Sequence, residues 1–95
     1  MPQCAEVTTY MPRYSSAGER LRARRLQLGL SLRDVHRAST RVAKELRNLS
    51  FSLPVSRLHF YETSESIPSA YRLYTLARLY GCKLSEILGW YGIPA

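Results

Sequence analysis

The sequence lacks the cysteine patterns that mark disulfide-rich and zinc-binding proteins. Its two cysteines, Cys4 and Cys82, lie at opposite ends of the chain, and neither belongs to a C-x-x-C motif or has a histidine at metal-ligand spacing. We therefore expect neither a disulfide scaffold nor a metal site, and the reducing cytoplasm fits this cysteine usage.

Long apolar runs are also missing. No run approaches the ~18 to 20 residues that span a bilayer, and the N-terminus lacks the basic-then-apolar layout of a signal peptide. We therefore expect no membrane partner. The 95 residues, 45% of them hydrophobic, allow one small domain with one core and exclude an enzyme with its own cofactor domain.

Catalytic motifs are equally scarce. The chain has no G-x-S-x-G, no H-E-x-x-H, no phosphate-binding glycine-rich loop and no paired acidic cluster. With only two histidines and seven carboxylates, we expect a non-catalytic protein that needs no cofactor.

Positive charge is abundant and unevenly placed. The 14 Lys and Arg exceed the 7 Asp and Glu, and 12 of these cations are Arg. Residues 1–50 carry ten cations and four acids, whereas residues 51–95 carry four and three. This asymmetry predicts a surface that meets a polyanion, although charge alone does not separate DNA, RNA and an acidic protein partner.

The hydrophobic spacing predicts an all-α fold of five helices with no strand. Residues 1–17 have no sustained period, and we expect them to form a flexible N-terminal arm in front of one domain over 18–95. Gly29 and Gly81 are typical of positions just past a helix end, and Ser31 with Asp34 resembles a capping box. The expected helices cover roughly residues 18–28, 31–47, 54–62, 68–80 and 84–91.

The second of these helices has two possible extents. Its apolar stripe continues at spacings of 3 and 4 from Leu32 to Leu46 without Gly or Pro, which favours one helix over 31–47 followed by a loop in which Phe51 is an apolar plug. In the alternative, the helix stops near Ser39 and Thr40 caps a separate arginine-rich helix over 41–47.

The opposite face of this long helix carries a cationic stripe. Its members recur at spacings of 4, 4 and 3, and they are Arg33, Arg37, Arg41 and Lys44. At a rise of ~1.5 Å per residue the stripe spans roughly 16 Å, so it can follow several duplex phosphates. A solvated outer face is the alternative. RNA is a weaker candidate because its readers usually stack bases on a sheet.

Several segments resemble, in the same order, the helices of the phage-repressor-like (Cro/repressor, XRE-type) helix-turn-helix domain. Helices 1 and 2 of that family are similar to GERLR at 18–22, Arg25 and GLSLRDV at 29–35. The later helices and their loop are similar to RLHFYE at 57–62, IPS at 67–69, LYTLARLYG at 73–81 and CKLSEIL at 82–88. The resemblance covers about residues 18–91.

The resemblance implies a five-helix bundle in which the second and third helices form the DNA-reading unit, helix 3 enters the major groove and helix termini grip phosphates. The phosphate contacts would come from the cationic stripe, and a helix-1 Arg25 would pair with Glu62 as a structural ion pair. The implied base-reading residues are Val55, Ser56, Arg57, His59 and Phe60, with Leu53, Leu58 and Tyr61 buried behind them.

The sequence departs from the family at three points. The second helix is about two turns longer than usual and is followed by a six-residue loop instead of a tight turn. Leu32 stands where the family often has a phosphate-binding Gln. Only Arg57 on the reading face offers a bidentate grip on guanine, so we expect modest sequence discrimination.

The function expected from these features is that of a prokaryotic transcriptional regulator that binds double-stranded DNA. Symmetric dimers are common in the family, and we expect a homodimer whose surface includes Tyr74, Trp90 and Ile93. The alternative is a protein-interaction adaptor or antitoxin-like module that keeps the fold without strong DNA binding.

Overall fold

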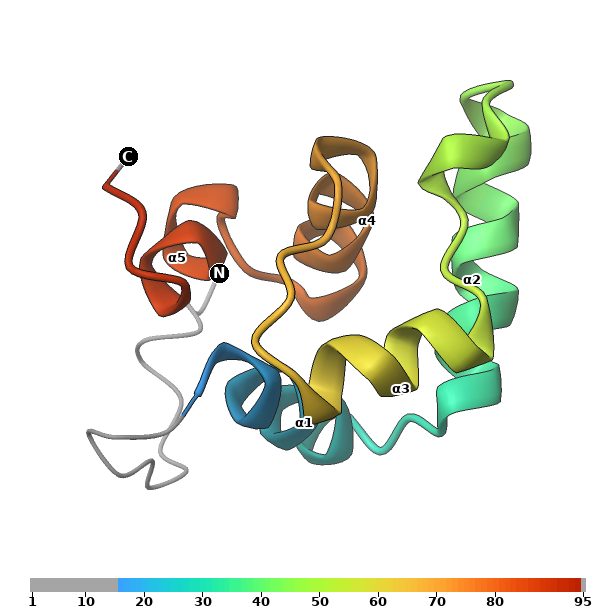
Figure 1. Ribbon diagram of the computed structural model, residues 1–95. Coiled ribbons are helices and arrows are strands. Elements are labelled where there is room, and N and C mark those ends of the chain that lie inside the picture. Colours follow the sequence, from blue (N-terminus) through green and yellow to red (C-terminus); the bar gives the residue numbers. More distant parts are fainter. Residues whose placement is uncertain (1–15, 95) are drawn as a thin grey trace.

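A computed structural model describes residues 16–94 and confirms the all-α prediction, with five α-helices, one 3-10 turn and no strand among these residues (Figure 1). The expected arm over 1–17 lies outside the described residues, except for Ser16 and Ala17, which begin the first helix. The elements are α1 (Ala17–Gln27), α2 (Leu32–Glu45), the 3-10 turn η2 (Leu49–Phe51), α3 (Val55–Thr63), α4 (Ala70–Tyr80) and α5 (Leu84–Trp90).

The helix boundaries follow local signals in the sequence. At the start of α2, the Ser31 hydroxyl accepts a hydrogen bond from the Asp34 N–H at 3.0 Å, and the Asp34 carboxylate accepts one from the Ser31 N–H at 2.8 Å. This reciprocal pair is the predicted capping box. Gly29 and Gly81 end α1 and α4 with positive φ angles of 73° and 67°, a conformation that glycine adopts without a steric penalty.

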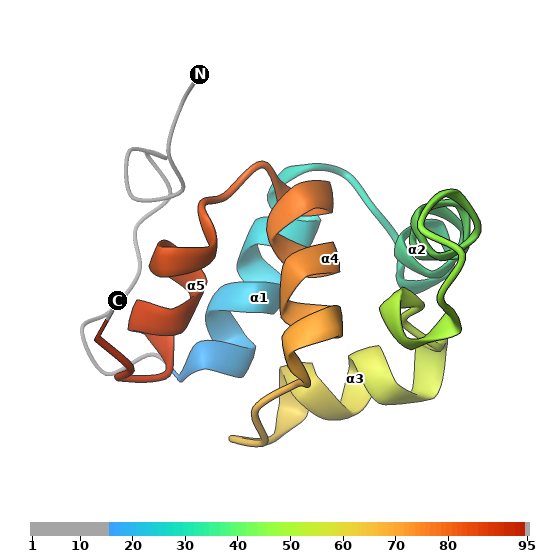
Figure 2. The ribbon, with the colours of Figure 1, turned by 90° about the horizontal axis from the view of Figure 1, so that it is seen from above.

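The helices surround one core. In Figure 1, α2, α4 and α5 lie in that order across the molecule, and α3 runs across the lower end of α2 toward α1. Figure 2 shows the same order from above, with α1 between α5 and α4 in this view. Leu21, Leu58, Leu76 and Ile87 are completely buried and come from α1, α3, α4 and α5 respectively, so each of these helices contributes to the same apolar interior.

A buried ion pair fastens α1 to α3. The Arg25 guanidinium donates to the two Glu62 carboxylate oxygens at 2.7 and 2.9 Å, and its remaining nitrogen, Nη1, donates to the Leu30 carbonyl at 2.9 Å. The predicted Arg25–Glu62 pair is therefore present in bidentate form. The two helices touch closely here, because a Cβ at Gly18 would lie 2.6 Å from the Tyr61 carbonyl oxygen.

The structure decides between the two extents of the second helix. α2 is continuous from Leu32 to Glu45, so the alternative with a break near Ser39 is wrong. Thr40 caps nothing, because its hydroxyl donates to the His36 carbonyl one turn earlier in the same helix. The chain leaves α2 through Arg47, whose φ of 54° is left-handed, and returns along α2 through η2.

Buried polar contacts hold this returning linker. The Ser39 hydroxyl, on the core side of α2, accepts a hydrogen bond from the Leu53 N–H at 2.8 Å, and the His36 ring nitrogen Nδ1 lies 3.0 Å from the Leu53 carbonyl. On the other side, the Thr75 hydroxyl of α4 donates to the Phe51 carbonyl at 2.7 Å. The linker is thus fixed between α2 and α4, and it sets where α3 begins.

We expect Ser39→Ala to lower the free energy of unfolding by about 1–3 kcal/mol, because the buried Leu53 N–H loses its acceptor. Chemical denaturation followed by circular dichroism measures this change. Thr40→Val is the control, since the Thr40 hydroxyl bonds only within α2. Equal midpoints for Ser39→Ala and the wild type would show that the Ser39 contact does not stabilise the linker.

One cysteine differs from the expectation. Cys82, just after α4, is disulfide-bonded, whereas the wide sequence separation of the two cysteines argued against a disulfide. The other cysteine of the sequence, Cys4, lies outside the described residues. Separation along the chain therefore did not predict the bonding state of Cys82.

Among residues 16–94, no helix is both long enough and apolar enough to span a bilayer.

Candidate nucleic-acid interface

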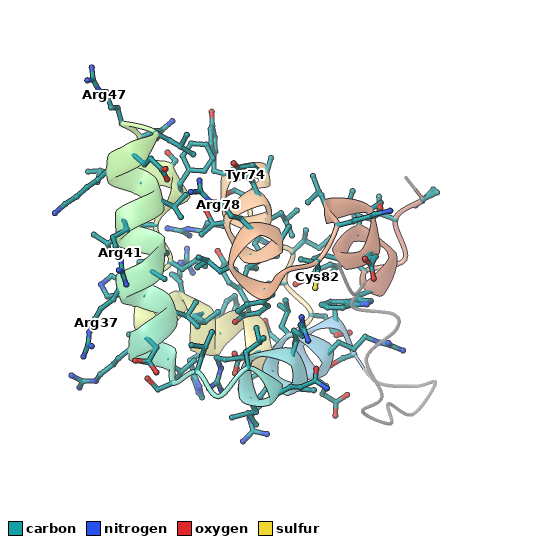
Figure 3. The ribbon with its side chains drawn as sticks, turned by 180° about the vertical axis from the view of Figure 1, so that it is seen from behind. Arg37, Arg41, Arg47, Tyr74, Arg78 and Cys82 are labelled. Carbon is teal, nitrogen blue, oxygen red and sulfur yellow. The ribbon has the colours of Figure 1, made fainter. Side chains whose placement is uncertain are left out.

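The cationic stripe forms an exposed ridge along α2. The α2 ridge consists of Arg33, Arg37, Arg41 and Lys44, all of them exposed. The opposite face of the helix buries Val35, Ser39 and Val42. Figure 3 shows Arg37, Arg41 and, just beyond the helix, Arg47 on the outer side of α2, away from α4.

The acidic residues of α2 do not neutralise the ridge. Hydrogen bonds from Ser31, first from its backbone N–H, hold the pKa of the Asp34 carboxyl below its ordinary value, and Arg37 contributes less. Glu45 forms an ion pair with Arg78 of α4 at 2.6 Å. Within residues 16–94, no ridge cation takes part in an ion pair. The ridge therefore presents its positive charge directly to solvent.

The outer face of α3 is open. Ser56, Arg57, His59 and Phe60 are exposed and Val55 is half-buried. Leu53, Leu58 and Tyr61 are buried, as the sequence predicts. The Arg57 guanidinium carbon lies 5.9 Å from the centroid of the Phe60 ring, a distance within cation–π range. The only cation on this face thus lies over an aromatic ring that is itself 42% exposed.

The linker brings the start of α3 to the flank of the ridge. Leu53, immediately before α3, bonds to His36 and Ser39 of α2. Arg33 is three residues before His36 and so lies next to it on the helix surface. The first turn of α3 and the N-terminal half of the ridge consequently occupy the same corner of the molecule, while the rest of α2 extends beyond α3 (Figure 1).

The three residues expected at a dimer surface do not form one patch. Tyr74 lies with its ring centroid 5.5 Å from that of Phe51 in η2, on the α2 side of α4. Trp90 packs against the core from α5, with Ile93 just beyond it, and α5 lies on the other side of α4 (Figures 1 and 3). Tyr74 instead belongs to an aromatic corner formed by Phe51, Tyr71 and Tyr74.

Two arginines on α4 support the interface in ways that the sequence pattern did not indicate. Arg72 donates to the Ser52 carbonyl at 3.1 Å and to the Tyr61 hydroxyl at 2.9 Å, so it links the linker and α3 to α4. Arg78 holds the far end of α2 through Glu45, and this bond raises the pKa of Arg78. Both contacts join residues far apart in sequence, and helical periodicity carries no signal for them.

Comparison with known proteins gives no match: no family model, curated protein or solved structure is similar to this chain at a significant level. Among the described residues, no group of three or more His, Cys, Asp or Glu is placed to hold a metal ion. The function is therefore inferred from the ridge, from α3 and from the way they are held together.

Proposed function

We propose that this chain is a double-stranded DNA-binding transcriptional regulator of the repressor-like helix-turn-helix type. The observation that carries the proposal is the α2 ridge, whose four exposed cations form no ion pair among the described residues. Closely spaced cations that no carboxylate neutralises favour a polyanion, and duplex DNA offers a phosphate every ~3.4 Å along each strand. The protein acts by occupying a promoter site, without chemistry.

The two surfaces have different roles in this proposal. The ridge contacts phosphates and fixes the orientation of the protein without reading sequence. α3 reads base edges: Arg57 takes a guanine through its bidentate fork, and Val55 and Phe60 contact thymine methyl groups. Ser56 and His59 add hydrogen bonds at the edges of the same groove.

As a homodimer, the protein would make these DNA contacts twice, once from each subunit. We therefore expect a DNA site with two-fold symmetry. Half-sites are then separated by about one helical turn, ~34–36 Å. Selection of genomic fragments bound by the protein tests the DNA target, its sequence preference and its symmetry together. A palindromic motif supports both the regulator and the dimer, whereas a non-palindromic motif supports the regulator alone.

Substituting one residue from each surface separates the two roles. We expect Arg37→Ala to weaken binding to all duplexes by a similar factor, since a phosphate contact is independent of sequence. Arg57→Ala should instead reduce the discrimination between sites with and without the guanine, by about 1–3 kcal/mol. Fluorescence anisotropy titrations on paired duplexes measure both effects. Identical behaviour of the two variants would contradict the assignment of roles.

The aromatic corner favours a second candidate, a protein-interaction adaptor or antitoxin-like module. The rings of the aromatic corner contact one another edge-on and remain partly exposed. Leu49, two residues before Phe51 in η2, is 80% exposed. Exposed apolar groups in contact with one another are typical of protein-binding surfaces. Mixing the protein with a random-sequence duplex at low salt distinguishes the two candidate functions. A DNA-binding regulator forms a complex with the duplex, whereas a protein-interaction adaptor does not.

A further inference from the structure

The C-terminal half of α2 extends away from α3 and carries its own cations. α3 is joined to α2 through His36 and Ser39, whereas Arg41 and Lys44 come later along the helix and are both exposed. In Figure 1, α2 rises from the first turn of α3 instead of running alongside α3. These later cations therefore lie progressively farther from the base-reading face.

Arg47 extends this group beyond the helix end. It adopts a left-handed φ of 54° and is exposed, and Figure 3 shows it at the far tip of α2. From Arg37 to Lys44 the helical rise amounts to about 10 Å, which corresponds to roughly three phosphate steps along one strand, and Arg47 lies beyond the helix end. The cations thus span more duplex than a single phosphate contact requires.

The far end of α2 is also held in place. The Glu45 carboxylate bonds to Arg78 of α4, and Asn48 fixes the turn that follows by accepting from the Ser50 N–H at 2.9 Å. Because Glu45 is directed toward α4, the last turn of the helix presents Lys44 and Arg41 to solvent. A braced helix end with exposed cations suits a contact made at a fixed distance from α3.

We propose that Arg41, Lys44 and Arg47 bind backbone phosphates of duplex DNA that lie outside the segment read by α3. This inference rests on the proposed function and names the part of the duplex that the extended α2 recognises. The lengthened helix would then extend the contacted DNA beyond the segment read by α3. The added phosphate contacts would raise the affinity whatever the sequence of the flanking DNA.

The test compares two variants on two lengths of duplex. Arg41→Ala/Lys44→Ala removes one Arg and one Lys from the far end of α2. Arg22→Ala/Lys83→Ala removes the same residue types from exposed positions on α1 and before α5. The probes are GC-rich, labelled duplexes of about 8 base pairs, which span ~27 Å, and of about 20 base pairs. Denaturation first establishes that both variants are folded.

On the longer duplex, we expect the slope of log affinity against log salt to fall by about 1.8 in the Arg41→Ala/Lys44→Ala variant, since each lost phosphate contact removes ~0.9. The control variant should keep the wild-type slope, and on the short duplex the slopes should agree. An equal loss on both lengths, or none on either, overturns the inference while leaving the proposed function standing. Failure of the wild type to bind either duplex overturns the proposed function itself.

Discussion

Raising the salt concentration from 50 to 200 mM is expected to weaken duplex binding by about a thousandfold. The estimate assumes about six neutralised phosphates, because log affinity falls by ~0.9 per phosphate for each decade of salt. Five of these contacts correspond to the exposed cations on and just after α2, which are Arg33, Arg37, Arg41, Lys44 and Arg47.

Anisotropy titrations of a labelled duplex over this salt range measure the slope. Circular dichroism at both salt concentrations controls for a change in folding. A flat response would mean that few phosphates are neutralised, and the α2 ridge would then be a solvated outer face. Replacing Arg33 and Arg37 by Ala should lower the slope by about 1.8, and an unchanged slope would place the phosphate contacts on another surface.

Glu62→Ala should lower the free energy of unfolding by about 3–5 kcal/mol, because it leaves the Arg25 charge buried without its carboxylate. Arg25 is only 6% exposed and would retain the Leu30 carbonyl as an acceptor. In the wild type the bond to Glu62 raises the pKa of Arg25. In the variant this bond is gone, but the guanidinium stays charged because arginine does not lose its proton in proteins.

Chemical denaturation of three proteins separates this penalty from a simple loss of packing. Glu62→Ala should be strongly destabilised, whereas the double variant Arg25→Met/Glu62→Leu should unfold close to the wild type or above it, since it removes both buried charges. Equal stability of Glu62→Ala and the wild type would show that the pair contributes nothing to holding α3 against α1.

The features predicted correctly are those encoded locally. The Ser31–Asp34 capping box, the glycines after α1 and α4 and the unbroken apolar stripe of α2 each depend on residues a few positions apart. These local signals do not depend on which other element the helix packs against. They were therefore sufficient to predict the five helices. Exposure of the α2 ridge was predictable for the same reason, because helical geometry separates it from the apolar face.

The contacts that the sequence did not reveal are tertiary. Ser39 occupies a place in the apolar stripe, yet its buried hydroxyl serves the Leu53 N–H from the returning linker. The Glu45–Arg78 pair joins two helices through residues that are 33 positions apart in the sequence. Tyr74 and Trp90 share the aromatic C-terminal part of the sequence, but in the structure they lie on opposite sides of α4. No period within one helix indicates which neighbour its outer face meets.

In the proposed complex, the α2 ridge and the exposed face of α3 contact one and the same DNA duplex. Backbone amide NMR spectra recorded during titration with a duplex test it most directly. We predict shift changes concentrated in residues 33–47 and 55–60, saturating together at one duplex concentration. Changes confined to α4 and α5, or changes in only one of the two segments, would contradict it.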